Sequence, residues 1–356
     1  MLNIKYGENE KALNLFIRDR VSWKSYQALD YIKSTIKYRW NWAVDGLGKP
    51  GLKFTSPARV LAGRPILAVE ETYDLIADRI NNKEPFFAGR FGHTELNMIV
   101  QVMNVRYGKQ EEYEQAALKQ LNTNAGFFPE NMQLGREFVD LMLRELPYLD
   151  LHGIWPLYME DYMIRRYESK NVKLTRLGNL EPFHVSRKSK TKPWSYALGG
   201  KKVLVIHPFA DTIKKQYSYH REQIFSRVLD AKDILPEFEL LTLKAVQTIA
   251  GNKDSRFGTW FEALDWMKKE CARIDFDVAI IGCGAYGFPL AAEIKRMGKI
   301  AIHMGGGLQL LFGICGGRWE SGDYAWYQDM VNDSWVRPCG DEIVKNNKII
   351  EGGCYW

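Results

Sequence analysis

The chain has 356 residues, of which 46% are hydrophobic, and its formal net charge is +6. This length suits one large or two ordinary domains with a substantial core, and the mild positive charge lacks the dense basic stripe of a nucleic-acid-binding protein. The five cysteines form no Cys-x-x-Cys pair that would suggest structural zinc, and without an apolar run of about 18 residues or an apolar signal core we expect a cytoplasmic protein.

The N-terminal part is expected to be a helical extension over residues 1–66. Apolar residues at helical spacing are followed by a basic, aromatic segment at residues 33–42. Such a segment suits the headgroup layer of a membrane, so peripheral membrane contact through residues 4–45 stays open. A helix packed on the body of the protein is the more usual meaning of this pattern and is the reading that we favour.

From residue 67 onward the predicted strands and helices alternate. Apolar runs predict strands at 85–91, 201–206, 238–243, 278–281 and 299–304. Helical spacing predicts helices at 68–80, 213–228, 260–271 and 290–297, with Asp211 expected to cap the second, and with Thr259 and Glu262 as a capping box at the third. This alternation predicts an α/β domain with a parallel sheet over residues 67–325, followed by a C-terminal tail packed on it at 326–356.

The most informative segment is 277–298, where a buried strand, a glycine-rich turn and a helix follow one another. Gly282, Gly284 and Gly287 match the spacing G-x-G-x-x-G, which lets backbone N–H groups approach a phosphate. A dinucleotide site also needs an acidic residue after the next strand, but that strand runs into Gly305-Gly306-Gly307. The pattern therefore favours a phosphate-bearing ligand over NAD.

Four of the predicted strands end in polar or glycine-rich segments, at 89–95, 207–211, 282–287 and 303–309. Because ligands of open parallel sheets bind at the carboxyl ends of the strands, we expect these segments to line one site. The sequence predicts a nucleotide-binding site there, formed by Arg90, Gly92, Gly282, Gly284, Tyr286, Gly287, Gly305, Gly306, Gly307, Gln309 and Arg318.

Two groups of carboxylates compete for a catalytic role. Asp275 and Asp277 spell the D-x-D of many sugar-nucleotide enzymes, but they precede a strand and so are expected at the opposite edge of the sheet. Glu95 follows a strand, and with His93 it offers oxygen and nitrogen donors for Mn²⁺ or Mg²⁺. It could equally polarise an acceptor hydroxyl.

Arg90-Phe-Gly-His-Thr-Glu95-Leu resembles the Arg-x-Gly-Asp-x-Glu segment of bacterial glycosyltransferases of the GT-D fold. The segments 203–209, 282–287 and 305–319 also look like parts of GT-D-like proteins, so that the resemblance runs from about residue 70 to about 320. It implies a Rossmann-like parallel sheet with helices on both faces, and a metal and a nucleotide-sugar diphosphate near the D-x-E motif. His93 stands where the family has the aspartate, so only Glu95 carries over.

Together these observations predict a glycosyltransferase that moves a sugar from a nucleotide-diphosphate donor to a hydroxyl acceptor during cell-surface polysaccharide or glycoconjugate synthesis. The acceptor is expected to be a glycan or a lipid-linked or protein-linked group. Arg90 or Arg318, with the helix N-termini after Gly284 and Gly306, would stabilise the leaving diphosphate. Candidate bases are Glu95, Asp211 and His207, in that order. The alternatives are a nucleotide-dependent oxidoreductase and a non-catalytic glycan-binding protein on the same fold.

Overall fold

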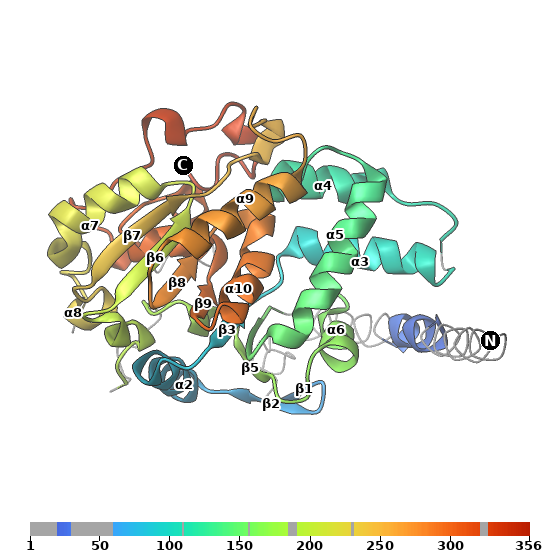
Figure 1. The fold of residues 1–356 in the computed structure, drawn as a ribbon, viewed down its shortest axis with the longest axis horizontal. Coiled ribbons are helices and arrows are strands. Elements are labelled where there is room, and N and C mark those ends of the chain that lie inside the picture. Colours follow the sequence, from blue (N-terminus) through green and yellow to red (C-terminus); the bar gives the residue numbers. More distant parts are fainter. Residues whose placement is uncertain are drawn as a thin grey trace, which may run out of the picture.

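The computed structural model describes residues 20–29, 60–108, 110–155, 157–183, 191–228, 231–320 and 327–356. Figure 1 shows these residues as one sheet with helices packed against it, and with the C-terminus above the sheet. None of the described helices is long and apolar enough to cross a membrane.

The sheet has nine strands in the order β1-β2-β5-β4-β3-β9-β8-β6-β7. Their bounds are β1 Val60–Leu61, β2 Arg64–Leu67, β3 Phe86–Gly89, β4 Leu151–Ile154, β5 Lys173–Arg176, β6 Lys202–His207, β7 Glu239–Lys244, β8 Val278–Ile281 and β9 Ile300–His303. The β1–β2 pair is antiparallel, and every other neighbouring pair is parallel. The carboxyl ends of the central strands therefore meet at one edge.

Helices cover both faces of this sheet, as the sequence predicts. In β6, Val203 and Val205 join one hydrophobic cluster while Leu204 and Ile206 join the other, because successive strand side chains point to opposite faces. One face packs against α3 His93–Arg106, α4 Gln115–Ala125, α5 Met132–Glu145, α9 Trp260–Arg273 and α10 Gly287–Arg296. The other packs against α2 Val69–Asn82, α7 Ala210–Ile224, α8 Ala231–Ile234 and α11 Leu308–Leu311. Burial on both faces explains why the central strands are almost wholly apolar.

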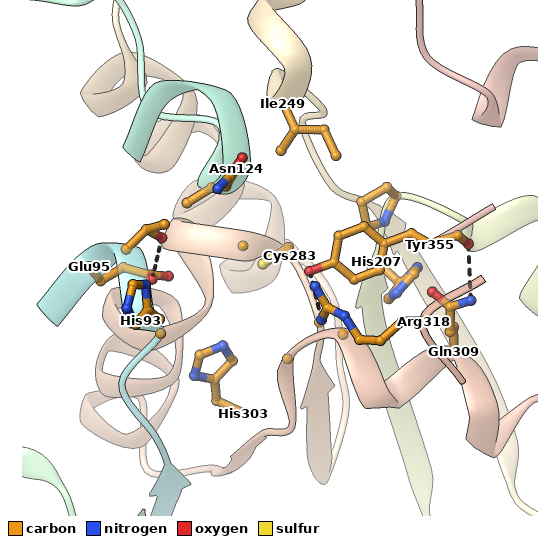
Figure 2. Close-up of a pocket in the computed structure, with 18 of the residues that line it drawn as sticks. His93, Glu95, Asn124, His207, Ile249, Cys283, His303, Gln309, Arg318 and Tyr355 are labelled. Atoms are coloured by element: carbon orange, nitrogen blue, oxygen red, sulfur yellow. Dashed lines mark hydrogen bonds between the residues drawn. The ribbon is translucent and has the colours of Figure 1, made fainter. Parts of the chain in front are cut away.

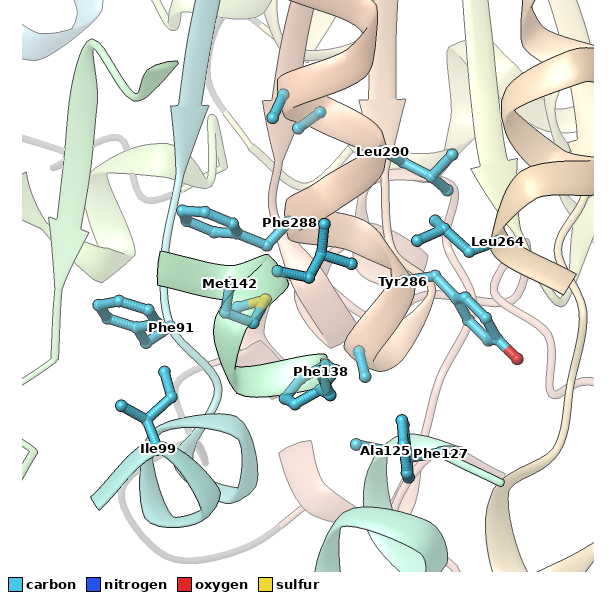
Figure 3. Packing of buried hydrophobic residues seen from close by; sticks show 14 of the residues in the cluster. Phe91, Ile99, Ala125, Phe127, Phe138, Met142, Leu264, Tyr286, Phe288 and Leu290 are labelled. Carbon is cyan, nitrogen blue, oxygen red and sulfur yellow. The ribbon is translucent and has the colours of Figure 1, made fainter. Parts of the chain in front are cut away.

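Figure 3 shows the first of these faces, where aromatic side chains from several helices meet. The rings of Phe91 and Phe288 stack with their centroids 5.6 Å apart, and those of Phe127 and Phe138 meet edge to face at 5.4 Å. These contacts join the segment after β3 to α10, and the segment after α4 to α5. The core thereby fixes the positions from which the candidate site residues project.

All five predicted strands are present, but β1, β2, β4 and β5 were missed. None of these has more than four residues, and polar or glycine residues interrupt the last two, as in Leu-His-Gly-Ile for β4 and Lys-Leu-Thr-Arg for β5. Such short segments show no clear alternation of apolar and polar residues. Since β2 covers Arg64–Leu67, the boundary drawn between residues 66 and 67 falls inside a strand of the sheet.

The helix at residues 20–29 packs on the body of the protein. The Trp23 side chain is fully buried and donates its indole N–H to Asn104 Oδ1 at 3.0 Å, and Gln27 donates to the same oxygen at 2.8 Å. These contacts agree with a packed helical extension. The rest of the segment 4–45, for which membrane contact is an open expectation, lies outside the described residues.

The C-terminal residues 327–356 run across the sheet edge without a long helix. Tyr327 and Trp335 are buried in the cluster that contains α2 and α7. The Glu342 carboxylate accepts the backbone N–H groups of Asp211 and Thr212, both at 3.1 Å. The N-terminus of α7 is thus capped by this tail rather than by Asp211, which corrects the expectation from the sequence.

Candidate functional site

A cavity of about 240 Å³ lies where β3, β9, β8 and β6 end. These four adjacent strands are the ones that precede the four predicted polar segments. The cavity is lined by Arg90, Gly92, His93, Thr94, Glu95, Asn124, Ala125, Trp155, His207, Pro208, Phe209, Gln247, Ile249, Gly282, Cys283, Gly284, His303, Gly305, Gly306, Gln309, Arg318, Glu351 and Tyr355. Figure 2 shows Glu95 and His93 on one side of it and Arg318 with Tyr355 on the other.

Most of the predicted site residues line this cavity, but Asp211, Tyr286, Gly287 and Gly307 do not. Asp211 is exposed on α7, and its carboxylate accepts a hydrogen bond from Lys244 Nζ at 2.8 Å. A surface ion pair outside the cavity cannot take a proton from an acceptor inside it. The structure therefore does not support Asp211 as a base.

Tyr286 belongs to the core rather than to the site. Its ring stacks on Trp260 with centroids 5.0 Å apart and an interplanar angle of 11°. Burial raises the pKa of its hydroxyl, which lies 3.5 Å from Thr248 Oγ1. Figure 3 shows this ring among the buried side chains of the core, near Phe127 and Ala125. The expectation that Tyr286 contacts the ligand is corrected.

Several glycines of the site make room for its own side chains. A Cβ at Gly92 would collide with the Glu95 carboxylate, and one at Gly305 would collide with the Arg90 guanidinium. At Gly307 a Cβ would meet Glu181, on the side away from the cavity. The sequence assigned these glycines to the nucleotide site, and the structure shows that they let polar side chains lie close to the backbone.

Gly284 has a different requirement. Its φ of +57° lies in the left-handed region, and a Cβ there would be 2.8 Å from the carbonyl oxygen of Ala125 at the end of α4. Both the backbone conformation and the close approach favour glycine. A substitution at Gly284 would disturb the α4 contact as well as any phosphate contact.

Glu95 lies in the first turn of α3 and is 8% exposed. Its carboxylate accepts a hydrogen bond from Thr94 Oγ1 at 2.9 Å. No ion pair joins it to a cation among the described residues, in contrast to Asp211. Glu95 is therefore available to a ligand in the cavity.

His207 presents a proton rather than a lone pair to the cavity. Its Nδ1 accepts the backbone N–H of Phe209 at 3.0 Å, so this hydrogen bond assigns the proton of the neutral ring to Nε2. Burial lowers the pKa of His207 to about 3. A neutral ring whose lone pair is already engaged makes a poor base. The structure thus favours His207 as a hydrogen-bond donor, which revises its predicted role.

The two cavity arginines are bound differently. Arg318 donates to Glu351 at 2.7 Å and to the Tyr355 hydroxyl at 3.3 Å, and its guanidinium lies 4.7 Å from the centroid of the Tyr355 ring. Arg90 donates from Nη1 to the carbonyl oxygen of Phe91 at 3.1 Å, and its buried Nε has no partner in the described chain. Arg318 is thus partly neutralised by a carboxylate, whereas Arg90 is not.

The helix dipoles contribute less than the sequence suggested. The helix after Gly306, α11, has only four residues, which leaves little dipole to act on an anion. At the start of α10, the space beside Gly287 is taken by the His303 ring. The N-terminus of α3, with Gly92 and His93, does face the cavity.

Sequence reasoning did not name five notable cavity residues as site residues, namely Asn124, Trp155, His303, Glu351 and Tyr355, although His303 is the first residue of the expected segment 303–309. Trp155 follows β4, one of the missed strands, so its place beside β3 could not be anticipated. Glu351 and Tyr355 come from the tail, where no periodic pattern points to a site. His303 could have been predicted, because it ends the predicted strand that precedes the three glycines.

The donor set does not fit a divalent cation held by this chain alone. The described residues include no group of three or more His, Cys, Asp or Glu side chains that could hold a metal ion. Around the cavity, Glu95 and the exposed His93 are the pair of donors expected from the sequence, and Glu351 is engaged by Arg318. Mg²⁺ and Mn²⁺ prefer several oxygen ligands. We therefore derive no catalytic step from such an ion.

The aspartates of the D-x-D pattern lie at the other edge of the sheet, as expected. Asp277 accepts the backbone N–H of Lys202 at 2.9 Å, at the amino ends of β6 and β8. Asp275 accepts from Lys202 Nζ at 2.7 Å and is largely exposed. Both carboxylates form hydrogen bonds at the amino ends of the strands, whereas the cavity lies at the carboxyl ends.

No family model and no curated protein matches the chain. One solved structure, described as the highly conserved domain of unknown function 1792 with a distinct glycosyltransferase fold, is similar over 82% of this chain and 91% of its own. The TM-score is 0.41 and the sequence identity is 11%. Likeness at this level does not assign a family, so the function has to be inferred from the cavity itself.

Proposed function

We propose that the protein is a glycosyltransferase that moves a sugar from a nucleotide-diphosphate donor to a hydroxyl acceptor. The observation that carries this proposal is the composition of the cavity. Two guanidinium groups and one nearly buried carboxylate without a cationic partner line a single cavity at the carboxyl ends of four parallel strands. Cations suit a diphosphate, and the carboxylate suits the activation of a hydroxyl.

Transfer breaks the bond between the sugar and the diphosphate, and the bonding electrons stay on the diphosphate oxygen. Arg90 and Arg318, which both line the cavity, would stabilise this growing negative charge. Arg90 brings an unpaired Nε–H, and the neutral His207 brings a donor at Nε2. These donors lie in a partly enclosed site, where electrostatic stabilisation is stronger than in water.

The acceptor oxygen forms the new bond to the sugar and must lose its proton. We assign this proton to the Glu95 carboxylate, since Asp211 lies outside the cavity and the His207 lone pair is engaged. Thr94 donates to the same carboxylate and would hold it in place. Glu95 then releases the proton to solvent after the product leaves.

Cell-surface polysaccharide or glycoconjugate synthesis in the cytoplasm is the setting that we propose, on the basis of the motif around Glu95. The acceptor would be a glycan or a lipid-linked or protein-linked hydroxyl. The exposed Trp155 ring and the Asn124 amide line the same cavity, and an aromatic face with a nearby amide suits a sugar acceptor.

The test is a screen of nucleotide sugars for slow hydrolysis, followed by transfer to candidate acceptors. We expect at least one nucleotide sugar to release its nucleoside diphosphate, while NADH causes no saturable change in tryptophan fluorescence. Saturable NADH binding without hydrolysis of any donor would instead support an oxidoreductase. Tight donor binding without any hydrolysis would support a glycan-binding protein.

A further inference from the structure

Unpaired buried polar atoms are concentrated at the cavity. Nε of Arg90, Nδ1 of His303 and Oε1 of Gln309 are buried and lack a hydrogen-bond partner among the described residues. Six such side-chain atoms occur in the described chain, so half of them belong to residues that line this one cavity. Because a buried polar group left unpaired costs free energy, this concentration indicates that a bound group completes the hydrogen bonds.

His303 ends β9 and is 3% exposed. Figure 2 shows its ring projecting from the strand end into the cavity. Its Nε2 lies against Gly287, the first residue of α10, where the positive end of a ten-residue helix favours a lone pair. The proton of the neutral ring therefore belongs on Nδ1, the atom that has no partner.

The charge around His303 keeps this ring neutral. Burial and the neighbouring Arg90 lower its pKa to about 3, and no carboxylate of the described chain is bonded to it. A neutral ring next to a guanidinium can donate a hydrogen bond without repelling the cation. The two side chains thus carry one positive charge, and His303 Nδ1 and Arg90 Nε have no acceptor among the described residues.

Only part of the Arg90 guanidinium forms hydrogen bonds with the described residues. Nη1 donates to the carbonyl oxygen of Phe91, and the Nη2 side packs against Gly305. The Nε–H has no acceptor in the part of the chain that the structure describes, so a ligand could supply one. An acceptor that satisfies both a cation and a neutral donor is an oxyanion with more than one oxygen.

We propose that His303 Nδ1–H and Arg90 Nε–H together bind one phosphate group of the ligand that fills this cavity. The identity of that ligand as a nucleotide sugar rests on the proposed function. The chemistry of the subsite does not, because phosphate oxygens of inorganic pyrophosphate or of a nucleoside diphosphate meet the same two donors.

The experiment compares three replacements of His303 by the Kd for inorganic pyrophosphate and for UDP, measured by calorimetry. In His303→Asn the amide nitrogen takes the place of Nδ1, and in His303→Gln it takes the place of Nε2. We expect His303→Asn to bind within a few-fold of the parent chain. His303→Gln, His303→Ala and Arg90→Lys should bind about 10- to 100-fold more weakly, as for a lost hydrogen bond to a charged group. His220→Asn, on α7 outside the cavity, is the matched control.

A loss of binding that does not discriminate between the Asn and Gln replacements would contradict the assignment of Nδ1. Equal binding by all folded variants would overturn the subsite altogether. If the variants fail to fold, the test is the NMR spectrum of the parent chain labelled with ¹⁵N-histidine. Pyrophosphate should then shift one imidazole with a protonated Nδ1, and an unchanged spectrum at saturating pyrophosphate would overturn the proposal.

Failure of the subsite and failure of the proposed function are separable. Binding of pyrophosphate through His303 in a protein that hydrolyses no nucleotide sugar would keep the subsite and remove the glycosyltransferase. Donor hydrolysis by a protein whose His303 variants bind diphosphate like the parent would keep the glycosyltransferase and remove the subsite.

Discussion

His152 and His303 are both fully buried and both lie on strands that flank β3, yet their charge states differ. Burial alone would lower the pKa of His152, but Glu168 and Glu160 outweigh it and raise the pKa to about 10. For His303, burial and Arg90 act in the same direction and lower the pKa to about 3. The neighbouring charges, and not the depth of burial, decide which histidine is a cation.

The surroundings of the two rings show what each region is built for. His152 contacts Glu168 through Nδ1 and lies 3.4 Å from Glu160 through Nε2, and Arg64 donates to Glu168 at 3.1 Å. Glu160 also accepts the backbone N–H of Trp155 at 3.2 Å. Charge is balanced within this cluster, whereas His303 faces a cavity with unpaired donors. The His152 cluster stabilises the fold next to Trp155. The His303 region has donors without partners among the described residues, as a ligand-binding site would have.

The largest expected effect is on turnover, and it tests the role of Glu95 in the cavity. Glu95→Gln keeps the shape of the side chain but cannot accept the acceptor proton, so turnover of a donor should fall about 10²- to 10⁴-fold with little change in thermal stability. Glu71→Gln is the matched control, because Glu71 also lies in the first turn of a helix but is far from the cavity. A Glu95→Gln rate within a few-fold of the parent would remove this residue from the mechanism.

The second effect tests the cluster around His152. Glu168→Gln leaves the buried His152 and Arg64 with too little negative charge, and removing one partner of a buried pair costs about 3–5 kcal/mol. Denaturant unfolding should show this loss, while the Kd for pyrophosphate in the folded variant stays near that of the parent. Asp275→Asn removes an exposed carboxylate that pairs with Lys202 and should have a much smaller effect on the unfolding free energy, because solvent screens an exposed ion pair. Equal losses in the two variants would contradict a structural role for the buried cluster.

The third effect is the pH dependence of stability. His152 binds a proton more tightly in the folded chain, so its contribution is present below pH 6.5 and is lost as the pH rises through about 10. His303 and His207 resist protonation when folded, so their contribution is present above pH 6.5 and is lost as the pH falls toward 3.

Each of these protons changes the free energy of unfolding by at most about 1.4 kcal/mol per pH unit. His152→Gln should flatten the alkaline limb of the stability curve, and His303→Asn should flatten the acidic limb. Unfolding measured by denaturant at a series of pH values checks both. If each substitution changed the opposite limb, the assigned charge states would be wrong.

The smallest effect concerns the two arginines. Glu351 is half-exposed and neutralises part of Arg318, so a donor diphosphate must compete with it. Glu351→Gln should therefore tighten UDP binding by a few-fold, in line with about 0.2–1 kcal/mol for an exposed ion pair. Calorimetry with UDP checks this, and Glu320→Gln, which removes the carboxylate partner of Arg337 outside the cavity, should leave the affinity unchanged. Weaker binding by Glu351→Gln would mean that this carboxylate orders the site instead of competing for it.

The sequence by itself determined the strands that carry the site. The runs that became β3, β6, β8 and β9 are apolar because helices cover both faces, and the polar segments after them had to meet at one edge of a parallel sheet. By the same rule the sequence placed Asp275 and Asp277 at the opposite edge, where the structure has them. These inferences depend only on strand direction.

The tertiary structure alone decided which side chains of those segments face the cavity. Spacing could not tell that Asp211 would pair with Lys244 on the surface, or that Tyr286 would stack on Trp260. It also could not show that the tail would bring Tyr355 to Arg318, because contacts between segments far apart in the chain leave no local pattern. Whether His303 carries a charge likewise depends on neighbours that only the folded chain brings together.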